Sequence, residues 1–203
     1  MNVLLIHGLG RTPRSLFNLE RQLQWAGHTT EHFSYAAFME SYDRIVERLQ
    51  VRLQDLSQQG NYGIVAHSLG GLLTRSALGL STIAPPTHIV MLGTPNQPPR
   101  LAVHAWRLLP FQWFSGQCGF NLTCAKFYAA IPPLQAPYTI VAGTIGPRGG
   151  LSPFGMELND GIVALSETRL SDHDRLIQLN VWHTFMMNDR LVQAVVLQSL
   201  GHI

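Results

Sequence analysis

Short apolar runs alternate with helix-period segments along most of the chain, and this alternation restricts the fold more than any other feature. The strand-length runs are VLLIHG, YGIVAH, HIVMLGTP and YTIVAGT. Such runs are typical of strands buried on both faces of a sheet. The clearest helical segment, residues 41–60, carries one apolar stripe that ends at Gly60. The pattern predicts an α/β fold with a mostly parallel central sheet and helices on both faces.

The rhythm breaks between residues 96 and 137, where short helical pieces mix with proline, glycine and seven aromatic residues. No composition shift divides the chain, so we predict a single domain over residues 1–203 with a cap- or lid-like insertion at about 96–137. The candidates for lining a substrate pocket are Trp106, Trp113, Phe114 and Met186. The alternative is that the aromatic residues form the insertion's own small core and that Met186 packs internally.

Composition excludes several functional classes. Charged residues make up 13% of the chain and the formal net charge is +2, without a cluster of lysine and arginine, so we expect no nucleic-acid partner. No apolar run approaches the roughly 20 residues of a membrane span, and no basic segment precedes the first apolar run, so we expect a soluble cytoplasmic protein. Contact with a membrane surface stays an open alternative, but nothing in the sequence supports it. No metal-ligand spacing or phosphate-binding glycine loop is present, which predicts neither metal nor cofactor.

The stretch AHSLGG ends one apolar run on a serine followed by two glycines. A nucleophilic serine at a sharp strand-to-helix turn needs small residues two positions before and after it. Ala66 and Gly70 occupy those positions around Ser68, which gives a G-x-S-x-G motif with its first glycine replaced by alanine. The alternative is an ordinary tight turn between strand and helix. The helix that starts at Leu69 points its N–H groups at the serine, where an oxyanion would develop.

A second motif, HGLG, closes the first apolar run at residues 7–10. Strand ends gather at one edge of an open parallel sheet, so this loop is expected beside Ser68. The backbone N–H of Leu9 then pairs with that of Leu69 as a two-donor oxyanion hole. Of the flanking residues, His7, Gly8 and His67 are expected to support these loops rather than to react.

These elements resemble the α/β-hydrolase superfamily, in particular its lipase and esterase branch and compact bacterial lipases. The resemblance spans nearly the whole chain through HGLG, AHSLGG, the strand ending LGTP, NDGIV and HTFMM, in that order. It implies a triad of Ser68, Asp160 and His183 in the order serine, acid, histidine. Asp160 follows a long Gly/Pro loop inside NDGIV, where a turn or capping role is the alternative reading. His183 follows the predicted last strand, RLIQLNVW.

Other titratable residues compete for the acid and base roles. The competing carboxylates are Glu157, Asp172 and Asp174, which we expect to be solvated. His173 comes after the predicted acid but before the last strand, and it is the second candidate for the base.

The expected function is hydrolysis of carboxylic esters with apolar acyl groups through an acyl-enzyme intermediate. The partner would be a small-molecule ester, and no cofactor is required. A thioesterase or acyltransferase that uses the same triad is the first alternative, and an amide or peptide substrate also stays open. A further alternative is a binding protein that keeps the fold without turnover.

Overall fold

The computed structural model describes residues 1–79, 83–171, 174 and 176–201 of the chain. Its described part contains one six-stranded sheet with the order β2-β1-β3-β4-β5-β6, in which every pairing is parallel. The strands are β1 (Asn2–Ile6), β2 (Thr29–Phe33), β3 (Tyr62–His67), β4 (His88–Leu92), β5 (Tyr138–Gly143) and β6 (Leu176–Leu179). β1, β3 and β4 are buried almost throughout, which confirms the prediction made from their apolar runs.

The strand order places a switch point between β1 and β3. From β1 the chain runs outward to β2 and then returns across the sheet to β3 on the other side of β1. Loops that leave neighbouring strands in opposite directions open a crevice at the carboxyl ends of those strands, and ligands bind there in open α/β sheets. Both HGLG and AHSLGG therefore lie at the edge of the sheet where a site is expected.

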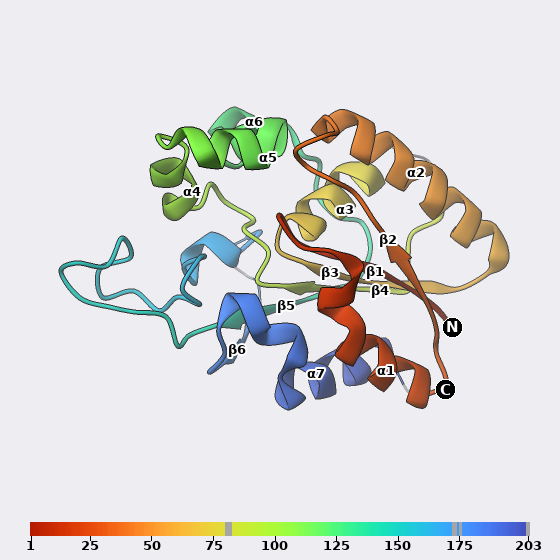
Figure 1. Cartoon of the computed structure of the whole chain (residues 1–203). Coiled ribbons are helices and arrows are strands. Elements are labelled where there is room, and N and C mark those ends of the chain that lie inside the picture. The colour runs from red at the N-terminus through yellow and green to blue at the C-terminus, as the bar shows by residue number, and fades with distance from the viewer. Residues whose placement is uncertain (80–82, 172–173, 175, 202–203) are drawn as a thin grey trace.

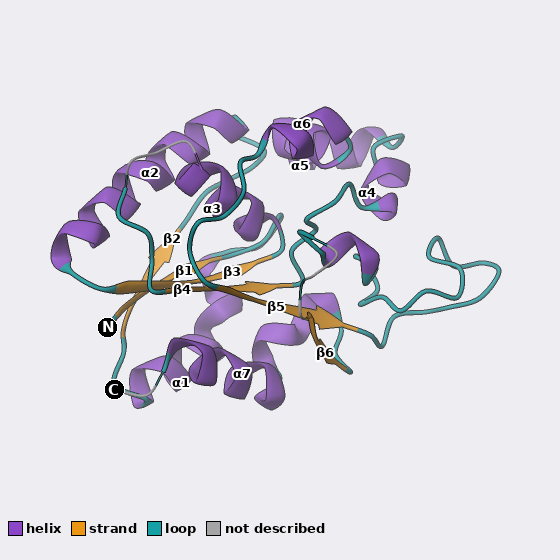
Figure 2. Cartoon of the chain, turned by 180° about the vertical axis from the view of Figure 1, so that it is seen from behind, coloured by secondary structure: helices purple, strands orange, loops and turns teal. Residues whose placement is uncertain are grey.

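Helices cover both faces of the sheet, as the sequence predicts. Figures 1 and 2 show α2 (Tyr42–Gln59) and α3 (Leu69–Gly79) on one face, with α1 (Phe17–Trp25) and α7 (Arg190–Leu200) on the other. Ser41 caps α2 by accepting the backbone N–H of Arg44. The α2 residues that are fully buried include its predicted stripe, Ile45, Leu49, Leu53 and Leu56. Each face of the sheet thus has its own apolar cluster.

The irregular segment between β4 and β5 holds three helices. They are α4 (Arg100–Ala105), α5 (Leu109–Leu122) and α6 (Ala125–Ala130). Figure 1 shows them grouped on the α2 and α3 side of the sheet. Side chains of this group share a cavity with the loops after β1 and β3, so the segment lies over the carboxyl ends of these strands.

Two local boundaries differ from the sequence prediction. The chain after Thr12 begins with a 3-10 turn, η1 (Pro13–Leu16), because both the backbone N–H and the hydroxyl of Ser15 bond to the Thr12 carbonyl. β6 ends at Leu179 rather than at Trp182, since the Val181 N–H bonds back to the Leu179 carbonyl and turns the chain. The remaining short helices are η2 (Ser166–Thr168) and η3 (His183–Asn188). None of the helices in the described ranges has the length and apolar character that a membrane crossing requires.

Candidate active site

Ser68 is the single residue between the end of β3 and the start of α3. Its φ angle is 54°, and it is the only non-glycine residue with a positive φ in the described part of the chain. This left-handed conformation costs an L-residue roughly 1–2 kcal/mol. Two backbone hydrogen bonds stabilise this conformation: the Ser68 N–H donates to the Leu92 carbonyl at 2.9 Å, and the Gly71 N–H donates to the Ser68 carbonyl at 3.0 Å. The turn projects the serine out of the sheet, as the motif predicts.

The loop after β1 lies directly against this turn. A side chain at Gly70 would place its Cβ 2.8 Å from the carbonyl oxygens of both Ile6 and His7, so only glycine fits this close approach. Leu69 is the first residue of α3, where a backbone N–H has no partner within the helix. For the Leu9 N–H, the described residues supply no acceptor. The two predicted oxyanion donors therefore belong to adjacent segments, the loop after β1 and the first turn of α3.

His183 and Asp160 form a buried pair. His183 Nδ1 lies 2.7 Å from Asp160 Oδ2, and the His183 N–H donates to the Asp160 carbonyl at 2.9 Å. The other carboxylate oxygen, Oδ1, accepts the N–H groups of Ile162 at 3.0 Å and Val163 at 2.7 Å. Asp160 thus closes its own turn through Oδ1 while it holds the imidazole through Oδ2. Its turn role and its role toward His183 are compatible.

Gly93, in the loop after β4, gives this pair its space. Its φ angle is +57°, and a Cβ at this position would lie 2.9 Å from His183 Nδ1 and 3.1 Å from Asp160 Oδ2. Both values are shorter than the roughly 3.5 Å at which non-bonded heavy atoms pack. The glycine of the LGTP element therefore makes room for the histidine–carboxylate contact.

Two further histidines support the loops in neutral form. His67 is buried beneath His183, with its Nε2 3.0 Å from the His183 carbonyl oxygen. Burial lowers the pKa of His67 well below 6.5, so the ring is neutral and donates Nε2–H to that carbonyl. Burial also lowers the pKa of His7, whose ring stacks on Tyr35 at 4.3 Å between centroids. His7 Nδ1 lies 2.9 Å from the Gly8 carbonyl oxygen and stabilises the turn of the HGLG loop.

Ser68 and His183 line one cavity of about 250 Å³, called here the Ser68 cavity. Its other walls are mainly apolar. Those from the segment between β4 and β5 include Leu101, Phe111, Phe114 and Leu122, and those from the loop after Asp160 are Ile162 and Val163. The cavity can hold an apolar group beside the serine hydroxyl and the imidazole.

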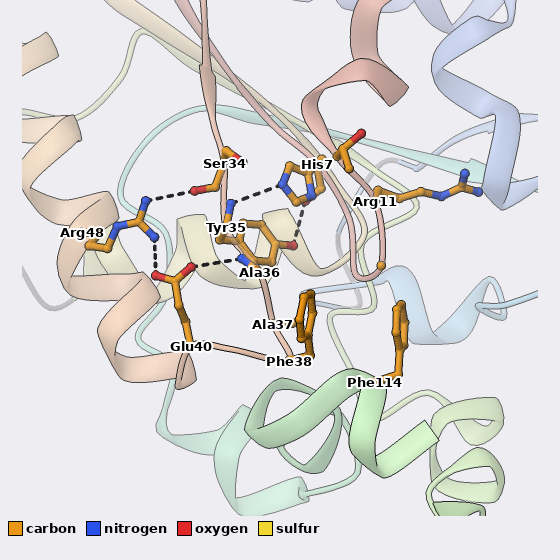
Figure 3. Close-up of a pocket in the computed structure, with 12 residues that line it drawn as sticks. His7, Arg11, Ser34, Tyr35, Ala36, Ala37, Phe38, Glu40, Arg48 and Phe114 are labelled. Carbon is orange, nitrogen blue, oxygen red and sulfur yellow. Dashed lines mark hydrogen bonds and ion pairs between the residues drawn. The ribbon is translucent and has the colours of Figure 1, made fainter. Parts of the chain in front are cut away.

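A second cavity, of about 520 Å³, adjoins the Ser68 cavity, and Figure 3 shows the residues that line it. Phe114 and Arg11 line both cavities. The Phe114 ring packs directly on the backbone of Gly10, so it forms a wall between the two spaces. The larger cavity is also lined by an Arg48–Glu40 ion pair, which is hydrogen-bonded to the chain just after β2. Arg48 donates to the Ser34 carbonyl, and Glu40 accepts the Ala36 N–H.

Comparisons with known proteins identify the architecture. No protein-family model and no curated protein sequence matches the chain. Similar solved structures include one from LipS and LipT, two metagenome-derived lipolytic enzymes, with a TM-score of 0.71, 14% identity, and 98% of this chain and 92% of that chain covered. An extracellular α/β-hydrolase from a Paenibacillus species gives a TM-score of 0.64 and 15% identity, with 98% of each chain covered. The chain has the α/β-hydrolase fold.

Phospholipase PlaB from Legionella pneumophila is also similar, with a TM-score of 0.67 and 15% identity over 84% of this chain. The present chain spans only 46% of that protein's length. At such identities the likeness establishes the fold alone, and the reaction has to be argued from the site.

The α/β-hydrolase fold brings some of the predicted pocket residues to the site and leaves others away from it. Phe114 lines the Ser68 cavity, whereas the other three candidates do not. Trp113 is 77% exposed, and Trp106 packs against Phe111 and Phe120 within the segment's own small core. Met186 is fully buried in the apolar cluster under the sheet. Trp106, Trp113 and Met186 therefore do not line the Ser68 cavity, because Trp106 and Met186 pack internally and Trp113 is exposed to solvent.

The competing acids are engaged elsewhere. Glu157 pairs with Arg100 and accepts the Ser166 N–H, and Asp174 accepts the Tyr138 hydroxyl at 2.8 Å. They are bonded within the protein rather than simply solvated. Asp172 and His173, the remaining competitors for the acid and the base, lie outside the described residues.

Arg11 is a site residue that the sequence analysis missed. It follows HGLG directly, and its NH2 group lies 3.4 Å from the Thr184 carbonyl oxygen beside His183. Its position next to a loop motif at a strand end was the available signal. In the described part of the chain, no group of three or more histidine, cysteine, aspartate or glutamate side chains is placed to hold a metal ion.

Proposed function

We propose that the chain is a serine hydrolase that cleaves carboxylic esters of apolar acyl groups through an acyl-enzyme intermediate. One observation carries the proposal. Ser68 and His183 line the same cavity, and His183 is held from behind by the buried Asp160 carboxylate. Strain at Ser68 adds support, since strained backbone is concentrated at functional sites.

The mechanism follows from which nitrogen of His183 is occupied. Asp160 binds Nδ1, so the proton of that nitrogen points at the carboxylate and Nε2 is the basic nitrogen. Nε2 takes the proton of the Ser68 hydroxyl as the oxygen attacks the ester carbonyl, and Asp160 stabilises the imidazolium that forms. The N–H groups of Leu9 and Leu69 receive the developing oxyanion. Protonated His183 then gives its proton to the leaving alcohol, and a water activated by the same ring releases the acid.

The walls of the Ser68 cavity favour an apolar acyl group. The cavity holds about 250 Å³, enough for a short or medium alkyl chain beside the reacting carbonyl. Its apolar lining offers no charged partner for the acyl chain apart from Arg11 at the boundary with the neighbouring cavity. Lipolytic enzymes and a phospholipase among the proteins of similar fold are in keeping with an ester substrate.

Hydrolysis of p-nitrophenyl esters with acyl chains from acetate to palmitate tests the proposal. We expect turnover that falls about a thousandfold or more in Ser68→Ala and in His183→Ala, since each removes a member of the proton-transfer chain. Ser57→Ala and His104→Ala, at residues that do not line the cavity, serve as matched controls and should keep the wild-type rate. Undiminished activity in Ser68→Ala would refute the assignment, and turnover of acyl-thioesters alone would move the substrate class to thioesters.

A further inference from the structure

A third cavity, of about 500 Å³, shares no lining residue with the Ser68 cavity. It is called here the Arg75 cavity. It lies between the second half of α3, the chain after β4, α6 and the segment before β5. Three polar side chains of interest face it, Arg75, Asn96 and Tyr128.

Arg75 is a buried cation without a carboxylate partner among the described residues. It is 5% exposed, and its NH1 group donates to Asn96 Oδ1 at 3.1 Å. Its Nε–H has no acceptor there. Asp174, a carboxylate that acts on Arg75 electrostatically, is already held by the Tyr138 hydroxyl and by the backbone N–H of Leu170 at 2.6 Å. Burial lowers the pKa of Arg75, although neighbouring groups, Asp174 among them, act in the opposite direction.

Tyr128 supplies a second donor without a partner. Its hydroxyl is buried and finds no hydrogen-bond partner within the described ranges, and the residue is only 7% exposed. Asn96 is fixed in turn, because its Nδ2 donates to the Thr168 carbonyl at 2.7 Å and leaves Oδ1 to orient Arg75. Buried polar groups are nearly always bonded, so two unpartnered donors on residues that line one cavity indicate a missing acceptor.

We propose that the Arg75 cavity binds a monocarboxylate with an apolar body. The guanidinium offers a planar set of donors that fits a carboxylate in two-point contact, and a single negative charge balances Arg75. The Tyr128 hydroxyl donates to the same group. The walls beyond these donors are largely apolar and include Ile131, Pro133, Leu134 and Leu170, which suits an alkyl chain. The volume lies within the roughly 300–1,000 Å³ of small-molecule sites. This inference does not depend on the proposed hydrolase activity.

Binding of decanoate to the full chain tests the proposal. We expect saturable binding by calorimetry, with a shift of the Arg75 Nε–H signal in nitrogen–proton NMR spectra that reports this cavity and not the Ser68 cavity. Arg75→Gln should weaken binding at this site about tenfold or more, and Tyr128→Phe should weaken it severalfold. Decanol, which lacks the charge, and acetate, which lacks the chain, should each bind much more weakly than decanoate.

A variant that keeps both donors separates a loss of binding from a loss of folding. Leu134→Trp fills the cavity, so it should abolish the decanoate-dependent shift of the Arg75 signal. The proposal is overturned if decanoate leaves that signal unmoved in the wild type. It is also overturned if inorganic phosphate or acetate shifts the signal at concentrations as low as decanoate does, or if decanoate still shifts the Arg75 signal of Leu134→Trp as in the wild type.

Discussion

Replacing Gly93 by alanine should disable the site while leaving the fold in place. An alanine Cβ would lie 2.9 Å from His183 Nδ1 and 3.1 Å from Asp160 Oδ2. Relief to a normal separation of about 3.5 Å requires a displacement of roughly 0.5 Å in the imidazole or the carboxylate. A shift of about 1 Å in a catalytic group can cost on the order of 100-fold in rate, so we expect ester turnover to fall about 10- to 100-fold. The fall should be in kcat, because the apolar cavity walls are untouched.

Gly155→Ala is the matched control for this prediction. Gly155 also has a φ of +57°, but a Cβ there would meet nothing within 4 Å. Both variants carry the same backbone strain, which should lower the free energy of unfolding by about 1–2 kcal/mol, measured by urea denaturation followed by tryptophan fluorescence. Only Gly93→Ala should lose activity. Full activity in Gly93→Ala, or an equal loss in Gly155→Ala, would refute the steric reasoning.

Three other outcomes follow from the same geometry. The free energy of unfolding should fall as the pH drops from 7 to 5, because burial lowers the pKa of His7 and His67 below 6.5, so the unfolded chain takes up protons on these rings at higher pH than the folded chain does. The slope reaches up to about 1.4 kcal/mol per pH unit for each ring, and an undiminished slope in denaturant titrations of His67→Asn would contradict it. Ser68→Gly should raise the free energy of unfolding by about 1 kcal/mol relative to Ser68→Ala, because only glycine relieves the positive φ; equal unfolding midpoints would count against stored strain. Phe114→Ala should join the two cavities that its ring separates and shift the ester preference toward bulkier substrates. An acyl chain-length profile identical to that of the wild type would contradict this prediction.

The fold could be predicted because its signals are local. Apolar runs buried on both faces identify parallel strands, and the stripe of α2 identifies a helix, without knowledge of distant contacts. The grouping of Ser68, Asp160 and His183 was what the resemblance to α/β-hydrolase motifs implied, and Ser68 and His183 also follow predicted strands, which end at one edge of a parallel sheet. A motif at the end of a predicted strand thus also indicates where in the fold its residues lie.

The lining of the cavities could not be predicted because it depends on packing between distant segments. Phe114 reaches the site because its ring packs on Gly10, about a hundred positions earlier in the chain. Trp113, its neighbour, points into solvent, and no sequence period separates the two in so irregular a segment. Arg75 gave no signal either, since an arginine in a helix is ordinarily solvated and only the tertiary structure reveals that it is buried.

Labelling with a fluorophosphonate, followed by mass spectrometry of the modified peptide, tests the central claim most directly. The probe reacts with an activated serine whatever the natural substrate is. The account predicts one modification at Ser68, absent in Ser68→Ala and slowed about a thousandfold or more in His183→Ala, which keeps the serine but lacks the base. An unlabelled wild-type protein, or a label on another residue, would contradict it.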